Sequence, residues 1–164
     1  MDGHKYLQWN QMSKITYQQE ALEDIKFEIQ PLLYEHWKEI AMYKDKVDLA
    51  PDWARYRGLE ESGALHVVTV RDDGVLVGYY VTLIVQGLHY RNTLYGMNDI
   101  VIIKPEYRNA GVGKKLFETV EAMLKEKGVQ VMTMHMKTYA PFDELCLALN
   151  YDYAERLYTK YIGD

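Results

Sequence analysis

The sequence predicts an α/β fold built on a mixed sheet. Residues 65–71 and 75–86 have strand-like composition and flank Asp72-Asp73-Gly74, a turn sequence typical of an antiparallel hairpin. Further along, the apolar run Ile100–Ile103 is followed by a loop, an amphipathic helix and another strand. A strand–helix–strand unit after an antiparallel hairpin gives an α/β domain whose sheet has both strand directions.

Length and composition indicate one globular domain spanning residues 1–164. A chain of 164 residues has the size of a single domain, and 48% hydrophobic with 26% charged residues is typical of globular proteins. The net charge of −5 argues against nucleic acid as a general partner, because phosphate binding needs a basic surface. The same charge is compatible with a cationic substrate such as an amine.

The cysteine content and the apolar stretches predict a cytoplasmic protein with no membrane partner. The single cysteine, Cys146, excludes an internal disulfide and fits a reducing compartment. The N-terminus lacks the apolar run of a signal peptide. The longest apolar stretch, 75–85, contains Gly78 and Thr82 and is too short to span a bilayer.

The N-terminal part is predicted to contain a strand and helices. Residues 1–13 are interpreted as a loose arm and 14–17 as a first strand. Apolar residues at helical spacing follow from 21 to 40, interrupted by Pro31. Proline breaks a helix interior but is tolerated in a first turn, so the pattern predicts either two short helices or one kinked helix. Residues 48–57 are expected to form a packed loop with a short helix, the alternative being a substrate-contacting segment.

The C-terminal part is predicted to hold two more strand-forming regions around a short helix. Residues 129–136 carry alternating methionines and are interpreted as a core strand. A short helix is expected at 141–149, with Asn150 in the left-handed cap position. Residues 151–162 are predicted to form a final hairpin.

The loop between the apolar strand and the helix predicts a phosphate-binding site. Its sequence, Arg108 to Gly113, has the pattern Arg-x-x-Gly-x-Gly. Two glycines let the backbone bend tightly and present amide groups to a ligand, and the helix start that follows attracts anions. Lys114 and Lys115 lie in the first turn, where positive charge is unfavourable unless an anion binds nearby.

Spacing excludes two other glycine-rich phosphate sites. A P-loop needs glycine five residues before the Gly-Lys pair and Ser or Thr after it, but Arg108 and Lys115 occupy those positions. A dinucleotide fingerprint needs a third glycine where the chain has Leu116.

The loop and the Lys104-Pro105-Glu106-Tyr107-Arg108 turn before it resemble the signature of the GNAT acyltransferase superfamily, over roughly residues 65–162. The resemblance implies a GNAT (acyl-CoA N-acyltransferase) fold, with a mixed central sheet of six to seven strands flanked by about four helices. It also implies an enzyme that transfers an acetyl group from acetyl-coenzyme A to a primary amine of a small molecule or protein. The chain further resembles a subfamily found in phage and prophage genomes.

The resemblance assigns the cofactor-binding residues. Backbone groups of Ile102 and Ile103 are expected to contact the pantetheine of acetyl-coenzyme A. The pyrophosphate is expected to be held by the loop and the helix start, namely Arg108, Asn109, Ala110, Gly111, Val112, Gly113 and Lys114.

Two residues are candidates for the base that deprotonates the amine. Asp99 lies just before the pantetheine-binding part of the strand, where superfamily members often carry an acidic residue; the alternative is a structural carboxylate bonded to a neighbouring loop. His89 follows a strand and could act as a base near neutral pH, the alternative being a structural histidine. The five histidines show no metal-ligand spacing, so no metal site is expected.

The general acid is not assigned by the resemblance. The superfamily usually uses a tyrosine in the helix before a Gly-Phe dipeptide, but here the dipeptide is Asn150-Tyr151 and the tyrosine position holds Cys146. Tyr139 and Tyr158 are the nearby alternatives. This departure leaves open a non-catalytic acyl-coenzyme A-binding protein with a structural or regulatory role. A homodimer is also left open.

Overall fold

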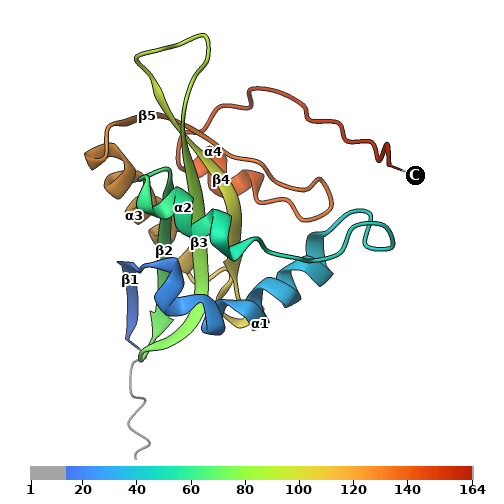
Figure 1. The fold of residues 1–164 in the computed structure, drawn as a ribbon. Coiled ribbons are helices and arrows are strands. Elements are labelled where there is room, and N and C mark those ends of the chain that lie inside the picture. Colours follow the sequence, from blue (N-terminus) through green and yellow to red (C-terminus); the bar gives the residue numbers. More distant parts are fainter. Residues whose placement is uncertain (1–13, 164) are drawn as a thin grey trace, which may run out of the picture.

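The computed structural model describes residues 14–163, which build a sheet with helices on both faces (Figure 1). Within these residues the sheet has five strands in sequence order, the first four antiparallel and the last parallel to its neighbour. The strands are β1 (Ile15–Gln19), β2 (Leu65–Asp72), β3 (Val75–Gln86), β4 (Leu94–Ile103) and β5 (Val129–Thr133).

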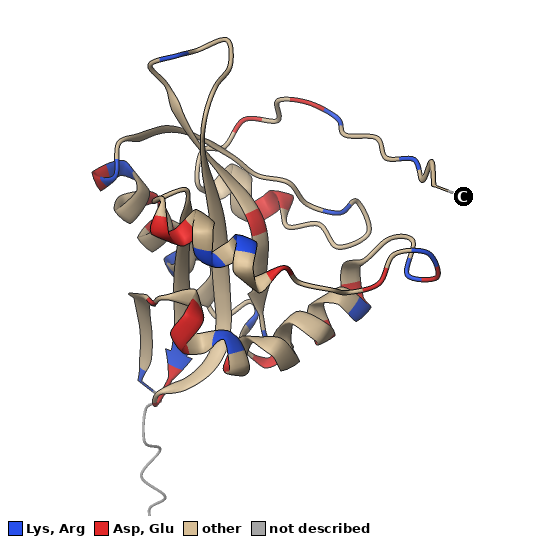
Figure 2. Ribbon diagram, viewed as in Figure 1, with Lys and Arg blue, Asp and Glu red and all other residues tan. Residues whose placement is uncertain are grey.

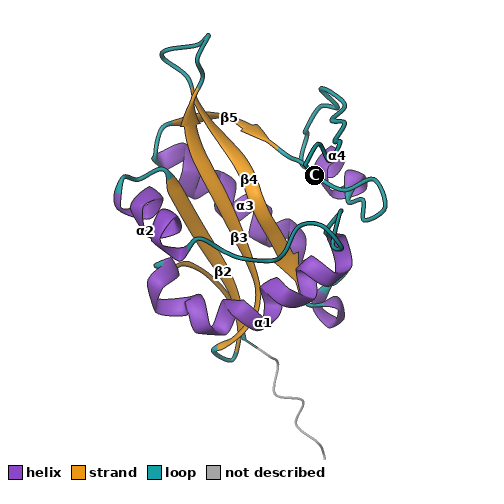
Figure 3. Ribbon diagram, turned by 45° about the vertical axis from the view of Figure 1, so that its right-hand side comes forward, coloured by secondary structure: helices purple, strands orange, loops and turns teal. Residues whose placement is uncertain are grey.

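Helices cover both faces of the sheet, as Figure 3 shows from a second side. They are α1 (Leu22–Ile40), α2 (Trp53–Glu61), α3 (Val112–Glu126) and α4 (Asp143–Ala148), with a short 3₁₀ turn at Pro105–Tyr107. No helix in the described part of the chain is both long and apolar enough to cross a membrane.

Burial on both faces explains the nearly continuous apolar runs of β2 and β3. Val67 and Tyr79 pack with α1, whereas Val68 and Tyr80 pack with α3 on the opposite face. Successive residues of a strand point to opposite faces, so a strand covered on both sides has no solvent-facing positions to make polar.

The hairpin turn and the main helix confirm the local sequence signals. Asp73 and Gly74, with φ of +46° and +85°, link β2 to β3 in the two-residue geometry that right-twisted hairpins favour. The α3 stripe is buried, and Gly128 ends the helix region with φ of +86°. Between the two alternatives for residues 21–40, the structure has one helix, with Pro31 inside it.

Two sequence-based expectations at the C-terminal end are wrong. The strand predicted at 129–136 ends at Thr133, and no strand forms within 151–163, so the final hairpin is absent. The described sheet therefore has five strands instead of six to seven, while the four α-helices agree with the expectation. A strand pattern becomes a strand only where a partner backbone pairs with it, and no described strand pairs with residues 151–163. Asn150 does take the left-handed conformation, with φ of +64°, and the proposed loose arm, 1–13, falls outside the described residues.

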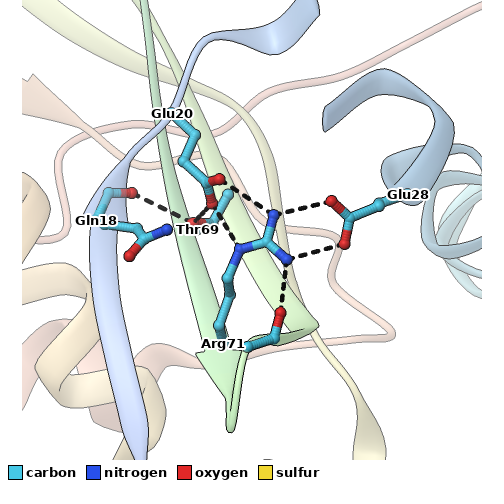
Figure 4. Close-up of polar contacts among 6 residues, drawn as sticks. Gln18, Glu20, Glu28, Thr69 and Arg71 are labelled. Carbon is cyan, nitrogen blue, oxygen red and sulfur yellow. Dashed lines mark hydrogen bonds and ion pairs between the residues drawn. The ribbon is translucent and has the colours of Figure 1, made fainter. Parts of the chain in front are cut away.

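A buried arginine ties the first strand and helix to the sheet (Figure 4). Arg71 of β2 donates to both carboxylate oxygens of Glu20 at 2.8 and 3.1 Å and to those of Glu28 at 2.8 and 3.0 Å. It also donates to the Gly74 carbonyl at 2.8 Å. Bidentate pairs of this kind fix the orientation of both partners, so this cluster holds the start of α1 against β2.

Candidate active site

The site begins where β4 and β5 diverge. The two strands pair only from Leu94 to Met97 on β4. At the next residue the side chain of Asn98, instead of its backbone, bonds to the chain that follows β5. Its amide donates to the His135 carbonyl at 2.8 Å and its oxygen accepts from the His135 N–H at 2.6 Å. Beyond this bridge, no strand in the described residues pairs with Ile100–Ile103 on the side away from β3. The end of β4 therefore has an open edge with backbone groups available to a ligand.

A bulge in β4 sets the position of Asp99. Asn98 is opposite Thr82 and Ile100 is opposite Val81, which leaves Asp99 without a partner residue on β3. A bulge re-aims the side chain of the extra residue. The Asp99 carboxylate is exposed and accepts a 2.7 Å hydrogen bond from the hydroxyl of Tyr56 on α2. Asp99 thus lies at the boundary between the open β4 edge and the helices.

A small aromatic pocket lies beside Asp99. The phenol of Tyr79 is fully buried in it, and among residues 14–163 its hydroxyl has no hydrogen-bond partner. Burial raises the pKa of Tyr79, with Tyr56 and Asp99 adding to the effect. Burial likewise raises the pKa of Tyr56, helped by the hydrogen bond to Asp99. Both phenols therefore keep their protons near neutral pH. The pocket is lined by Leu22, Ile29, Leu33, Trp53, Tyr56, Tyr79, Val81 and Ile100.

The glycine loop presents an uncapped helix start. Asn109 and Gly111 adopt left-handed φ values of +64° and +79°, which turn the chain tightly into α3. No side chain of the described residues caps the helix at Gly111. The first amides of a helix have no acceptor within it, so they are available to an anion. A Cβ built on Gly111 meets nothing within 4 Å, so the space beside it is open for a ligand.

The turn before the loop is anchored on both sides. The Tyr107 hydroxyl donates to the Asp72 carboxylate at 2.7 Å, which fixes the turn to the end of β2. Lys114, in the first turn of α3, is 57% exposed in its side chain and is 3.8 Å from Glu118. This long, weak pair leaves its ammonium able to reach an anion at the helix start.

The loop is connected to α1 through Arg108. Its guanidinium donates to both oxygens of Glu39 at 2.9 Å each, and its Nε donates to the Ile103 carbonyl at 2.8 Å. The hydrogen bonds from Arg108 lower the pKa of Glu39. Burial lowers the pKa of the neighbouring His36. The side chain of Arg108 is thus engaged, while the loop backbone remains open.

The other sequence-based candidates lie on different elements from Asp99. His89 is exposed in the loop at the tip of the β3–β4 hairpin, while Asp99 lies five residues beyond the start of β4, roughly 17 Å along the strand. The Tyr139 hydroxyl donates to the Ile40 carbonyl at 2.5 Å, at the C-terminal end of α1. Tyr158 is 83% exposed, and Cys146 is buried in the core beside α3.

Sequence reasoning missed Tyr56 and Glu39 as parts of the site. Glu39 lies in the helical region 21–40 and Tyr56 in the segment 48–57, and neither residue is among the sequence-based candidates. Tyr56 meets Asp99 across 43 residues, and Glu39 meets Arg108 across 69. The one available signal for Tyr56 was its place in a segment for which substrate contact was the alternative interpretation.

The splayed strand pair, the open β4 edge, the uncapped helix start and the carboxylate at the bulge together fit an acyl-transferring class of protein. Residues 22–141 match the sequence model of the acetyltransferase (GNAT) family, and the chain belongs to this family. It is an N-acetyltransferase, and acetyl-coenzyme A is its acyl donor. A search of the curated proteins finds no match.

Solved acetyltransferases share the fold at low sequence identity. A predicted acetyltransferase with acetyl-CoA from Clostridium acetobutylicum has a TM-score of 0.71 and 10% identity over 90% of this chain and 96% of that one. A ribosomal-protein-alanine N-acetyltransferase from Brucella melitensis biovar Abortus 2308 has a TM-score of 0.64 and 19% identity over 92% of this chain and 99% of that one. An aminoglycoside acetyltransferase from an uncultured soil metagenomic sample, in complex with sisomicin, has a TM-score of 0.67 and 15% identity over 92% of this chain and 95% of that one.

Proposed function

We propose that the protein acetylates a primary amine of a small molecule or protein, and that Asp99 is the base that takes the proton. The observation that carries this proposal is the position of the Asp99 carboxylate between the aromatic pocket and the open edge of β4. An amine held beside Tyr56 and a thioester lying along the edge would meet at this carboxylate.

The residues present fit acetyl-coenzyme A, which supplies the acyl group and a thiolate leaving group when bound. Backbone groups of Ile102 and Ile103 would hold the pantetheine, because this part of β4 has no strand on its outer side. The loop Arg108–Gly113 and Lys114 would hold the pyrophosphate. The open space at Gly111 and the uncapped amides of α3 support this role.

Asp99 would act on the acceptor before attack. Amines are mostly ammonium ions near neutral pH and must lose a proton before the nitrogen lone pair can attack the thioester carbon. Asp99 takes that proton, directly or through a water. Tyr56 keeps its own proton, so its hydroxyl holds the carboxylate in place as a donor. Tyr139 is proposed as the donor to the departing thiolate, and His89 is given no role because of its distance from Asp99.

The proposed acceptor class rests on the net charge of the chain and on the acceptors named for two similar structures. The net charge of −5 favours a cationic acceptor. One similar structure binds sisomicin and another is named for ribosomal-protein alanine, so both small-molecule and protein amines fit the fold. Lysine and arginine are spread over helices and loops beside acidic residues (Figure 2), which supports the absence of nucleic acid among its partners. The enzyme is also proposed to be a single domain, to act in the cytoplasm and to be similar to phage and prophage members of the family.

The test is an assay of free thiol released from acetyl-coenzyme A with a panel of amines. Asp99→Asn keeps the size of the side chain but removes its basicity, so turnover should fall by about 10²- to 10⁴-fold while the thermal shift induced by the cofactor is kept. Asp24→Asn, an exposed change in the first turn of α1, is the matched control and should leave turnover unchanged. Unchanged turnover in Asp99→Asn across neutral and mildly alkaline pH would make Asp99 structural.

A further inference from the structure

An ion pair joins the first helix to the glycine loop, and the proposed chemistry does not use it. Arg108 donates from two guanidinium nitrogens to the two carboxylate oxygens of Glu39, each at 2.9 Å. Its third nitrogen, Nε, donates to the Ile103 carbonyl at 2.8 Å. A guanidinium that meets a carboxylate through two parallel hydrogen bonds is fixed in orientation as well as in position. The side chain of Arg108 therefore links α1, the end of β4 and the glycine loop at one point.

These contacts direct the Arg108 side chain to the fold and leave other groups for the phosphates. Hydrogen bonds from Arg108 hold the pKa of Glu39 below its ordinary value, so the carboxylate is ionised near neutral pH and the pair persists there. The helix start at Gly111 has no cap from a described side chain. Its amides and the Lys114 ammonium are therefore the groups that remain for a pyrophosphate.

The same turn of α1 also contacts the chain on the other side of the split between β4 and β5. The Tyr139 hydroxyl, in the segment between β5 and α4, donates to the Ile40 carbonyl at 2.5 Å. Glu39 and Ile40 are neighbours, and they contact the chain that follows β4 and the chain that follows β5, respectively. Where the two strands stop pairing, the side chain of Asn98 ties them together. The end of α1 is thus a further tie across the split.

We infer that the last turn of α1 braces the acetyl-coenzyme A site, and that Glu39 is the positioning residue that holds the glycine loop through Arg108. The inference rests on the proposed placement of the cofactor along the open edge of β4 and in the loop. A cofactor held at both places binds well only if the strand and the loop keep their relative position. A loop that is fixed before binding costs less to order, so the pair raises the affinity for the cofactor without touching the reacting atoms.

The pair itself adds little to the stability of the fold, which makes its effect on the cofactor separable. The side chains of Arg108 and Glu39 are 38% and 42% exposed. Ion pairs this open to water are screened and contribute little to the free energy of unfolding. Loss of the pair should therefore leave the melting temperature without ligand nearly unchanged while the affinity for acetyl-coenzyme A falls.

The test measures the dissociation constant of acetyl-coenzyme A by calorimetry. Glu39→Gln keeps the size of the side chain and removes its charge, so the constant should rise about tenfold. Arg108→Lys keeps a positive charge but loses the planar fork that reaches Glu39 and Ile103 together, so it should raise the constant by a similar factor. Turnover at saturating cofactor, with the best amine of the panel, should stay within about twofold of wild type in both variants.

Glu35→Gln is the matched control. Glu35 lies one turn earlier on the same helix and pairs with Lys38 at 2.7 Å, so the variant also removes a carboxylate that belongs to an ion pair. It should leave the dissociation constant unchanged, because neither partner contacts the glycine loop. An equal loss in this control would overturn the inference, since the general charge of α1 would then set the affinity.

The double variant decides between a brace and a direct contact of Arg108 with the pyrophosphate. If the pair acts as a brace, Glu39→Gln combined with Arg108→Lys loses about as much affinity as either single variant, because each removes the same interaction. If Arg108 leaves Glu39 to bind the pyrophosphate, Glu39→Gln frees it and binding becomes tighter. Tighter or unchanged binding in Glu39→Gln overturns the inference, and so does a double variant whose loss is the product of the two single losses.

Gly111→Val distinguishes a failure of this inference from a failure of the proposed function. If Gly111→Val keeps the thermal shift caused by acetyl-coenzyme A, the loop does not hold the pyrophosphate and the proposed placement of the cofactor is wrong. If Gly111→Val loses the shift while Glu39→Gln binds the cofactor as wild type does, the placement stands and only the brace is refuted.

Discussion

The loop glycine Gly111 gives the sharpest test of cofactor binding. It has φ of +79°, a conformation that costs a residue with a Cβ about 1–3 kcal/mol. A domain of this size loses about 2–4 °C per kcal/mol, so Gly111→Val should melt about 2–12 °C below wild type without ligand. The side chain would also enter the open space expected to hold the pyrophosphate.

The readout is the thermal shift caused by acetyl-coenzyme A. At 100 times its dissociation constant the ligand should add about 2.7 kcal/mol to wild type, or roughly 5–11 °C. Gly111→Val should lose this shift. Gly63→Val is the matched control, because Gly63 has φ of +75° and equally open surroundings but lies after α2; it should be strained by a similar amount and keep the shift.

A third variant separates the two glycines of the loop. A Cβ on Gly113 would lie 3.6 Å from Ile103 and Leu145, which is ordinary contact, and no left-handed φ is involved. Gly113→Ala should therefore keep both stability and the shift. A full shift in Gly111→Val, or an equal loss in Gly63→Val, would refute the assignment of the loop.

Three further predictions concern the base, the fold and the acid. Tyr56→Phe removes a hydrogen bond to a charged group, worth about 1.5 kcal/mol or more, so turnover should fall about tenfold while cofactor binding is kept; an unchanged rate would make the contact structural. Arg71→Met should destabilise the protein by about 3 kcal/mol at neutral pH. Burial opposes the charge of Glu20, but hydrogen bonds led by Arg71 lower its pKa, so the stability they give is present above the ordinary glutamate pKa of about 4.3 and is lost as pH falls below it. Melting temperatures below pH 5 should thus fall more steeply in wild type than in Arg71→Met, and parallel curves would contradict this. Cys146→Ala should keep most activity, because this thiol is buried in the core against α3, whereas Tyr139→Phe should cost about 10²-fold or more; the reverse order in two folded variants would exchange their roles.

The sequence by itself determined the features that depend on neighbouring residues. The hairpin at Asp73-Gly74, the α3 stripe and the glycine loop follow from turn preference, helical spacing and backbone freedom, and these act over a few residues. The loop also indicated the GNAT family, because its spacing resembles that signature and excludes a P-loop and a dinucleotide fingerprint.

Tertiary structure decided which distant groups meet. The contacts of Tyr56 with Asp99 and of Glu39 with Arg108 depend on where α1 and α2 pack on the sheet, which no local pattern encodes. Residues 151–163, after α4, show the same limit, because the strands predicted there do not form. Its residues favour a strand, but a strand exists only when a second backbone pairs with it, and that partner is set by the arrangement of the whole molecule.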